Sequence, residues 1–245
     1  IIDSSDLLLT NLLTGETVNL SGQGTVVSAD VGANKTVTSV NLALTGANAG
    51  NYTLNSYTTS FEILPKVINL TGTKVYDGLN TVPNASLTVT TGVSGQSLGL
   101  KGAGTLISAS SGNGKTISIG TLELDSIGSG SESNYTLSGG NHTFNVTARP
   151  LTFSSSRNYD GTTTANTSGL TYTFSNLVVG ESLILSGSGT VVSKDVSAGT
   201  QNITLGTIAL GDNTGVASNY SLTSGTMDIT QKQVNLTGTK VYDND

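Results

Sequence analysis

The sequence contains no cysteine and no tryptophan, and only one histidine. Without cysteine there is no disulfide framework, no thiolate zinc site and no cysteine nucleophile. A small secreted domain of this composition therefore depends on its hydrophobic core alone. The absence of cysteine also suits a protein that is exported unfolded through a narrow secretion pore.

Charged residues are scarce as well, at 11% of the chain, and the formal net charge is −6. The lysines and arginines are scattered, which argues against the basic patch that nucleic-acid binding requires. No apolar run approaches the length of about 18 residues that indicates a membrane-spanning helix, so we expect no membrane insertion. Ile1 begins no signal peptide, and the absence of an initiator Met leads us to expect a piece of a longer protein.

The chain is instead rich in Val, Ile, Leu, Thr, Ser and Asn, and it contains 31 glycines. β-Branched side chains suit a pleated sheet, while Gly and Asn suit turns that need a positive φ. Hydrophobic residues make up 35% of the sequence, which is too many for a disordered chain. This composition favours an all-β fold with many turns.

The same segments recur along the chain at a fixed interval. Tyr76, Tyr159 and Tyr242 lie 83 residues apart and occupy the same place in similar segments. A constant period of this kind indicates a tandem array. We therefore expect a first repeat that lacks its opening strand, two complete repeats and the opening strand of a fourth, over residues 1–65, 66–149, 150–231 and 232–245.

The first recurring motif is Lys/Arg-x-Tyr-Asp followed by Gly or Asn, at the end of the opening strand of a repeat. Gly and Asn at its last position share easy access to positive φ, and the preceding Asp can accept hydrogen bonds from nearby backbone N–H groups. We interpret the motif as a turn that closes the first strand, in preference to a ligand site. Its residues are Tyr76, Asp77, Gly78, Tyr159, Asp160, Gly161, Tyr242, Asp243 and Asn244.

The second recurring motif is Asn-Tyr-x-Leu, near the end of each repeat. Its tyrosines are Tyr52, Tyr135 and Tyr220. By position, they resemble the tyrosine corner of Ig-like sandwiches, in which a buried ring carries a hydroxyl that reaches the backbone. We expect a structural role for these residues too.

Short segments with alternating apolar residues fill the rest of each repeat, about seven of them, and no segment has a helical period. Each repeat closes on such a segment, in which apolar residues stand two apart, as in Phe144-Asn145-Val146. Regular short strands at this spacing are typical of an antiparallel β-sandwich of the Ig-like type. We expect one such sandwich for each repeat.

Glycines mark two places inside each repeat. A Gly-x-Gly segment between two alternating runs, beginning at residue 22, 102 or 187, predicts a β-hairpin. A longer strand follows at 36–44, 116–124 and 202–210. In the last two copies Gly120 and Gly206 shift the alternation by one residue, which predicts a β-bulge.

The junctions between repeats leave almost no linker. Pro65 and Pro150 stand between the last strand of one repeat and the first of the next, and proline fixes its own φ and restricts the residue before it. A Gly/Ser linker would swivel freely. The junctions therefore predict a stiff, linear rod of tandem sandwiches.

The order and spacing of the two motifs resemble the YDG repeats of large bacterial surface proteins, which are similar to mostly-bacterial Ig-like repeats. Asn244 in place of Gly, and Arg157-Asn158 in place of Lys-Val, depart from the pattern. The resemblance covers the whole chain and implies a secreted or cell-surface segment of an adhesin of the filamentous-haemagglutinin or biofilm type. The implied function is that of a stalk or spacer without catalysis.

The sequence also bears on a binding module, a calcium site and an enzyme as alternatives. A binding module would contact a glycan, a matrix polysaccharide or sister fibres directly, but the chain has no Trp for sugar stacking. Calcium needs six or more oxygen ligands; Asp30 and Asp195 align, yet the middle repeat has Ser110 or Ser111 there. An enzyme is the remote alternative, since His142 has no histidine counterpart in the other repeats and no pair of carboxylates stands out for sugar hydrolysis.

The repeat boundaries also suggest partners. Neighbouring repeats of the same chain are the first. A further hypothesis is strand addition between molecules, because an unpaired sheet edge invites an extra strand. The segment 234–242 of one molecule would then complete the first repeat of the next, head to tail.

Overall fold

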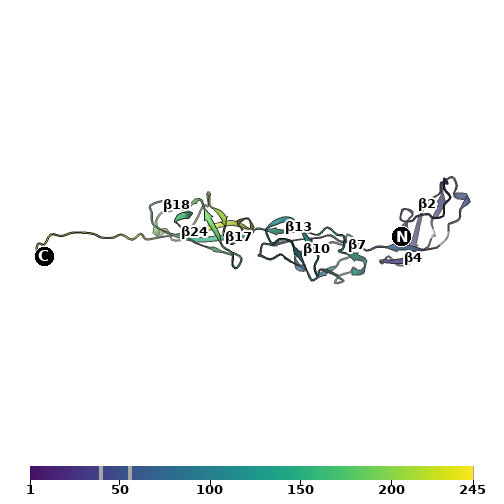
Figure 1. The fold of residues 1–245 in the computed structure, drawn as a ribbon, viewed down its shortest axis with the longest axis horizontal. Coiled ribbons are helices and arrows are strands. Elements are labelled where there is room, and N and C mark those ends of the chain that lie inside the picture. Colours follow the sequence, from purple (N-terminus) through teal and green to yellow (C-terminus); the bar gives the residue numbers. More distant parts are fainter. Residues whose placement is uncertain (39–40, 55–56, 245) are drawn as a thin grey trace. The chain divides into compact units, whose positions relative to one another are not determined.

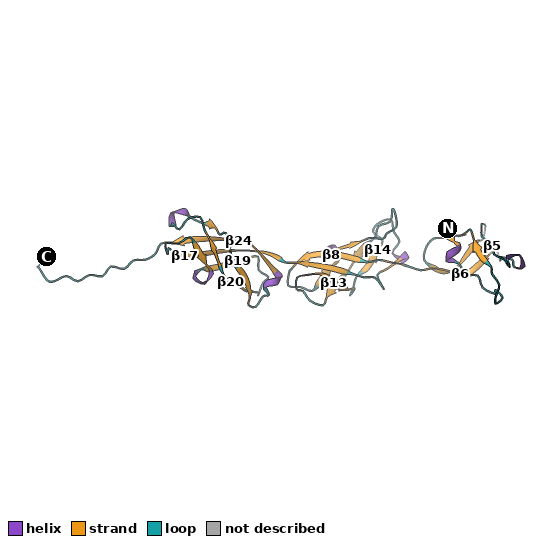
Figure 2. Cartoon of the chain, turned by 90° about the horizontal axis from the view of Figure 1, so that it is seen from above, coloured by secondary structure: helices purple, strands orange, loops and turns teal. Residues whose placement is uncertain are grey.

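A computed structural model describes residues 1–38, 41–54 and 57–244 (Figure 1). Its described elements are β-strands and three-residue 3-10 turns (Figure 2). This confirms the all-β sandwich fold that the composition and the alternating pattern predict. No described helix is long and apolar enough to cross a membrane.

The first repeat has one four-stranded sheet, in the order β1-β3-β4-β6, and a separate pair of strands, β2 and β5. Its elements are β1 (Ile2–Asp3), η1 (Ser4–Asp6), β2 (Asn19–Ser21), β3 (Gln23–Val26), β4 (Gly32–Thr38), β5 (Ala43–Thr45), η2 (Ala49–Asn51) and β6 (Tyr57–Ile63).

The second repeat has a six-stranded sheet, in the order β10-β8-β16-β13-β12-β9, and the pairs β11-β14 and β15-β7. Its elements are β7 (Lys66–Val67), β8 (Leu70–Val75), β9 (Thr81–Pro83), η3 (Asn84–Ser86), β10 (Leu87–Val89), β11 (Gly99–Lys101), β12 (Ala103–Leu106), β13 (Gly112–Ser118), β14 (Glu123–Asp125), η4 (Glu132–Asn134), β15 (Tyr135–Thr136) and β16 (Thr143–Thr147).

The third repeat has a sheet in the order β19-β17-β24-β22 and the pairs β18-β21 and β20-β23. The long strands β17 and β24 run parallel and lie side by side (Figure 1). Its elements are β17 (Arg149–Asn158), β18 (Thr164–Asn166), η5 (Thr167–Gly169), β19 (Thr171–Ser175), β20 (Leu183–Ser186), β21 (Ser188–Thr190), η6 (Val196–Ala198), β22 (Gln201–Asn202), β23 (Ala209–Asp212), η7 (Ala217–Asn219) and β24 (Tyr220–Thr230).

Alternation along the opening and closing strands builds the core. The apolar positions are buried while the residues between them on β16 and β24 are exposed, as a period of two requires for strands with one face on a core. Residues at these positions that are at most 5% exposed are Ile68, Leu70, Phe144, Val146, Leu151, Phe153, Met227 and Ile229.

The chain divides into two compact units, which do not coincide with the predicted repeats. The first comprises residues 1–71, 88–103 and 119–142, and the second comprises 72–87, 104–118 and 143–245. Each unit therefore holds part of the second repeat together with one flanking repeat. The predicted repeat boundaries stay predictions from sequence periodicity.

The predicted hairpins at the Gly-x-Gly segments are wrong. β11 pairs with β14, whereas β12 pairs with β13, so the chain changes partner strands at Gly102 instead of folding back on itself. A Cβ on Gly102 would lie 2.0 Å from the carbonyl oxygen of Thr121. Glycine is needed because two backbone segments pass each other there; Gly22 and Gly187 make the same approach, to Asn41 and Thr207.

The predicted long strands are wrong for the same reason. Residues 116–124 are divided between β13 and β14, and residues 202–210 between β22 and β23. The glycines that shift the alternation, Gly120 and Gly206, have φ of 59° and 55°, and they turn the chain out of one sheet and into the other. In the first copy, residues 39–40 lie outside the described residues.

Residues 231–244 form no strand and no helix, and their large apolar side chains are exposed. The segment predicted to open a fourth repeat has no partner strand in the described chain. A β-strand forms only with a partner for its backbone N–H and C=O groups.

The crossing geometry predicts that substitution by alanine destabilises the third repeat much more at one glycine than at another. Gly187→Ala should lower the free energy of unfolding by about 2–4 kcal/mol, because φ is strained for alanine and the carbonyl of Thr207 must move. Gly169→Ala, where an added Cβ meets no atom within 4 Å, should cost less than about 1 kcal/mol. Urea denaturation of both variants measures the two losses of stability. Equal midpoints would contradict the close passage of two backbone segments at Gly187.

Candidate functional site

The Tyr-Asp-Gly motif forms the same turn in each copy. In the second repeat, Lys74 Nζ lies 2.9 Å from Asp77 Oδ1, which also accepts a hydrogen bond of 2.9 Å from the Leu79 N–H. The next residue, Gly78, has a φ of 79°. Burial alone would raise the pKa of Asp77, but the hydrogen bonds from Lys74 and Leu79 outweigh it and the pKa is lowered.

The other two copies repeat this arrangement. Arg157 pairs with Asp160, and Lys240 Nζ lies 2.8 Å from Asp243. The residues after the aspartates, Gly161 and Asn244, have φ of 79° and 70°. Sequence reasoning included the cation three residues before each Asp in the motif, but it missed the ion pair between the two residues.

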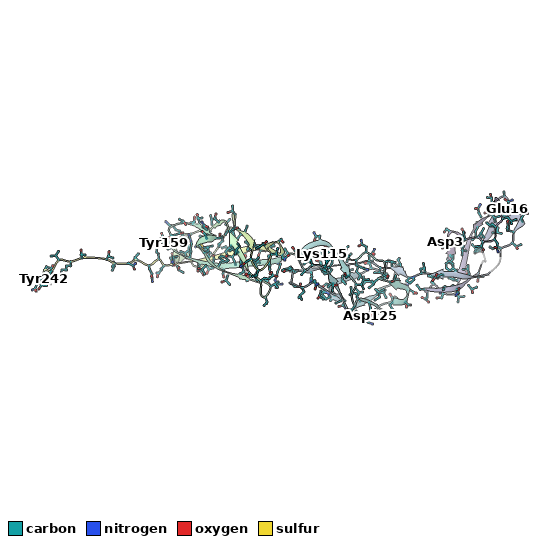
Figure 3. The ribbon with its side chains drawn as sticks, viewed as in Figure 1. Asp3, Glu16, Lys115, Asp125, Tyr159 and Tyr242 are labelled. Carbon is teal, nitrogen blue, oxygen red and sulfur yellow. The ribbon has the colours of Figure 1, made fainter. Side chains whose placement is uncertain are left out.

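The tyrosine rings of the motif differ in their surroundings. Tyr159 is half-buried in the third repeat, whereas Tyr242 is exposed on the C-terminal segment (Figure 3). Tyr242 donates a hydrogen bond of 2.7 Å to its own turn residue, Asn244. Tyr76, in contrast, is only 5% exposed.

Within the second compact unit, Tyr76 reaches from the second repeat to a carboxylate of the third. Its hydroxyl donates to Glu181 Oε1 over 2.5 Å, and the Tyr220 hydroxyl donates to Glu181 Oε2 over 2.6 Å. The two rings meet edge to face, with centroids 5.5 Å apart and planes at 79°. One carboxylate thus joins two tyrosines from adjacent repeats.

The tyrosines around Glu181 hold their protons more tightly than usual. Burial, followed by the hydrogen bond to Glu181, raises the pKa of Tyr76 to about 12. The pKa of Tyr220 is raised by the same two causes. Both hydroxyls therefore stay neutral donors over the physiological pH range.

The hydroxyl of each second-motif tyrosine donates a hydrogen bond to a Glu or Gln side chain, which stands at the equivalent position in all three repeats. Tyr52 donates to Glu16, Tyr135 to Gln96 and Tyr220 to Glu181. Tyr52 and Tyr220 also accept a backbone N–H at 3.1 Å, from Leu13 and Val178. Sequence reasoning missed the acceptors, although a Gly-Glu or Gly-Gln pair stands at the equivalent position of each repeat.

The asparagine of the second motif contacts the preceding repeat. In the first compact unit, Asn134 Oδ1 accepts from the Val31 N–H at 2.8 Å, and Asn134 Nδ2 donates to Asp30 at 2.8 Å. In the second unit, Asn219 Oδ1 accepts from the Ser111 N–H at 2.8 Å. The two junctions therefore share one hydrogen bond, made by equivalent residues.

Two of the residues considered as calcium ligands, Asp30 and Ser111, lie at these contacts. Hydrogen bonds from Asn134 and then Ser28 lower the pKa of Asp30, and Ser111 Oγ donates to the Ser218 carbonyl at 2.8 Å. Among the described residues, no group of three or more His, Cys, Asp or Glu could hold a metal ion.

Arg149 adds a further contact at the junction between the second and third repeats. Its guanidinium donates to the carbonyl oxygen of Tyr76 at 3.2 Å and to the backbone and side-chain oxygens of Asn176 at 2.6 and 2.8 Å. Only Ala148 separates β16 from β17, and only Leu64 and Pro65 separate β6 from β7.

His142 occupies a buried position inside the second repeat, at 5% exposure. Its Nδ1 accepts from the Leu70 N–H at 3.1 Å, and its Nε2 lies 2.9 Å from the Leu137 carbonyl oxygen. Both ring nitrogens thus bind backbone groups, and the imidazole holds the opening strand in place.

A family model described as YDG domain matches the chain three times, over residues 2–60, 64–143 and 145–227. No curated protein and no solved structure matches the chain. The three matches follow one another along the sequence with gaps of a few residues and include the Asn-Tyr motif in each copy.

Removal of one hydroxyl should weaken the junction measurably. Tyr76→Phe leaves Glu181 with one tyrosine donor and should lower the free energy of unfolding by about 1–2 kcal/mol. The Tyr159 hydroxyl has no hydrogen-bond partner within the described ranges, so Tyr159→Phe should change stability by less than about 0.5 kcal/mol. The urea midpoints of the two variants measure these changes in stability. Equal losses would contradict a stabilising hydrogen bond between Tyr76 and Glu181.

Alkaline pH should destabilise the same contact. Tyr76 and Tyr220 have raised pKa values in the folded chain, so between pH about 10 and 12 the folded state binds more protons than the unfolded state. Stability should therefore fall across this window. Denaturation at stepped pH measures the slope, which should be shallower in the variant Tyr76→Phe/Tyr220→Phe; identical slopes would contradict the assignment.

Proposed function

The chain belongs to the YDG domain family, and from this premise we propose that it is a spacer segment of a secreted or cell-surface bacterial adhesin. Its repeats are similar to mostly-bacterial Ig-like repeats and carry no catalysis. The proposed task is mechanical, namely to hold a distal adhesive or secretory module away from the cell.

The observation that carries this proposal is the hydrogen bond shared by both junctions. Asn134 and Asn219 each accept a backbone N–H of the preceding repeat at 2.8 Å. Asparagines that recur once per repeat thus form hydrogen bonds between neighbouring repeats. Contacts at these positions are what a spacer needs in order to resist bending. Strands that follow one another with one or two residues between them leave no flexible linker of the Gly/Ser type.

Composition supports an extracellular location. The chain is rich in Ser, Thr and Asn, carries a net charge of −6 and has no cysteine. A mildly acidic surface of this kind keeps long arrays soluble. A chain without thiols also passes through export unfolded without forming wrong disulfides.

Small-angle X-ray scattering tests the spacer role. A spacer is expected to give a narrow distribution of interatomic distances, because its junctions contain no flexible linker. Insertion of Gly-Ser-Gly-Ser after Ala148 should give a broader distribution of interatomic distances, since such a linker behaves as a flexible coil. An unaltered profile after insertion would show that the natural junction already swivels.

We also propose that a second copy of the chain can add a strand to the first repeat. A cavity of about 680 Å³ there is lined by apolar residues that include Leu20, Val37 and Phe61. In the second repeat, Ile68 and Leu70 of the opening strand are 1% and 0% exposed. Their counterparts on the C-terminal segment, Val234 and Leu236, are 86% and 99% exposed.

Deletion of residues 233–245 tests strand addition. Light scattering should report a concentration-dependent increase in mass for the intact chain and a monomer for the truncated one, because the deletion removes the added strand. In a longer chain the same segment would open a fourth repeat instead. Equal masses for the two proteins would contradict strand addition.

A further inference from the structure

The closing strand of the first repeat, β6, lies at the edge of its sheet. Lys35 of β4 pairs with Phe61 of β6 just as Lys115 of β13 pairs with Phe144 of β16, so β6 and β16 are equivalent strands. In the second and third repeats the closing strand also has the opening strand, β8 or β17, on its other side. Within the described residues, β6 has no strand on that side.

Residues 7–10 mark the other side of the same gap. They follow η1 as β10 follows η3, and β10 pairs with the opening strand β8. Residues 7–10 form no strand, because a strand needs a partner for its backbone N–H and C=O groups. The cavity of the first repeat is lined by residues 7–10 and by Phe61 of β6. One strand that enters there would restore the strand order of the other two repeats.

The end of the third repeat is built like the end of the second. The Tyr76 N–H donates to the carbonyl oxygen of Thr147 at 2.9 Å, and the Tyr159 N–H donates to that of Thr230 at 2.8 Å. The Tyr76 hydroxyl continues to Glu181 of the following repeat. The Tyr159 hydroxyl has no hydrogen-bond partner in the part of the chain that the structure describes. The third repeat thus presents the same donor without its acceptor.

The turn after Tyr159 is also uncovered. A Cβ added to Gly78 would lie 2.9 Å from Cγ1 of Val178 in the following repeat. A Cβ added to Gly161 would approach only the Tyr159 hydroxyl of its own turn, at 4.0 Å. In the first repeat Leu13 stands at the position of Val178, and it is 68% exposed.

The first repeat carries the matching acceptor. Tyr52 donates to one oxygen of Glu16. In the third repeat Tyr220 donates to one oxygen of Glu181 in the same way, and the second oxygen of Glu181 accepts from Tyr76. The second oxygen of Glu16 has no hydrogen-bond partner among the described residues. It is therefore available to a tyrosine hydroxyl from another molecule.

The C-terminal segment has the length to bring these groups together. Val234 follows Thr230 at the same spacing at which Leu151, a buried residue of β17, follows Thr147. Entry of residues 234–242 beside β6 of a second copy therefore joins the two molecules over the same length of chain that joins the second and third repeats.

From these observations we propose that the first repeat of a second copy docks on the end of the third repeat. Tyr159 donates to Glu16 of the second copy, and Leu13 of that copy covers the turn at Gly161. The proposal rests on the strand addition proposed above, and it adds the residues that recognise the partner.

Sedimentation velocity over a series of concentrations measures the self-association of the full chain. Tyr159→Phe should weaken the association about ten-fold, because it removes a hydrogen bond to a carboxylate while it keeps the ring. Tyr76→Phe is the matched control, since it removes the same hydroxyl at the contact with Glu181 and should leave the association unaltered.

A second substitution tests whether Glu16 is the partner. Glu16→Gln keeps an oxygen for Tyr52, as Gln96 does for Tyr135 in the second repeat, but it offers no second oxygen to Tyr159. In this background the further effect of Tyr159→Phe should be less than about two-fold, because substitutions of two residues in contact do not add.

Three results would overturn the docking and leave strand addition in place, provided that the chain without residues 233–245 is monomeric. They are unchanged association of Tyr159→Phe, equal weakening by Tyr76→Phe, and a full ten-fold effect of Tyr159→Phe in the Glu16→Gln background. A truncated chain that associates as strongly as the intact one, or an intact chain that stays monomeric, would overturn strand addition and the docking together.

Discussion

The carboxylate of Glu181 is the group on which the junction between the second and third repeats depends. It accepts hydrogen bonds from Tyr76 and Tyr220, and these two rings pack edge to face. A carboxylate in such surroundings needs donors for its oxygens, since an ion without partners is costly to bury. The turn at Tyr76 therefore does more than close a strand, because it places the Tyr76 hydroxyl against Glu181 of the third repeat.

The two motifs divide the contact between repeats. Tyr76 of the first motif contacts Glu181 of the following repeat, whereas the asparagines of the second motif contact the preceding repeat, at Val31 or Ser111. The second repeat thus uses one motif for its contact with the third repeat and the other for its contact with the first.

Much of the fold was predictable from periodicity, whereas the pairing of strands was not. Phe144 and Val146 alternate and are buried as expected. Gly102 and Gly187 led to the wrong prediction of β-hairpins, because a glycine between two strands is equally consistent with a hairpin and with a crossing between sheets. Glu181 and Asn219 were missed as junction residues because their partners lie about a hundred residues away, and no local pattern reports such contacts.

The central claim is that Glu181 and its two tyrosines join the turn of Tyr76 to the third repeat within the second compact unit. Residual dipolar couplings of backbone amides in a weakly aligning medium test it most directly. The account predicts that one alignment tensor fits residues 72–87, 104–118 and 143–230 of the natural chain, which all belong to that unit, and that Glu181→Ala requires two. A natural chain in which residues 72–87 and 150–230 already require separate tensors would contradict the claim.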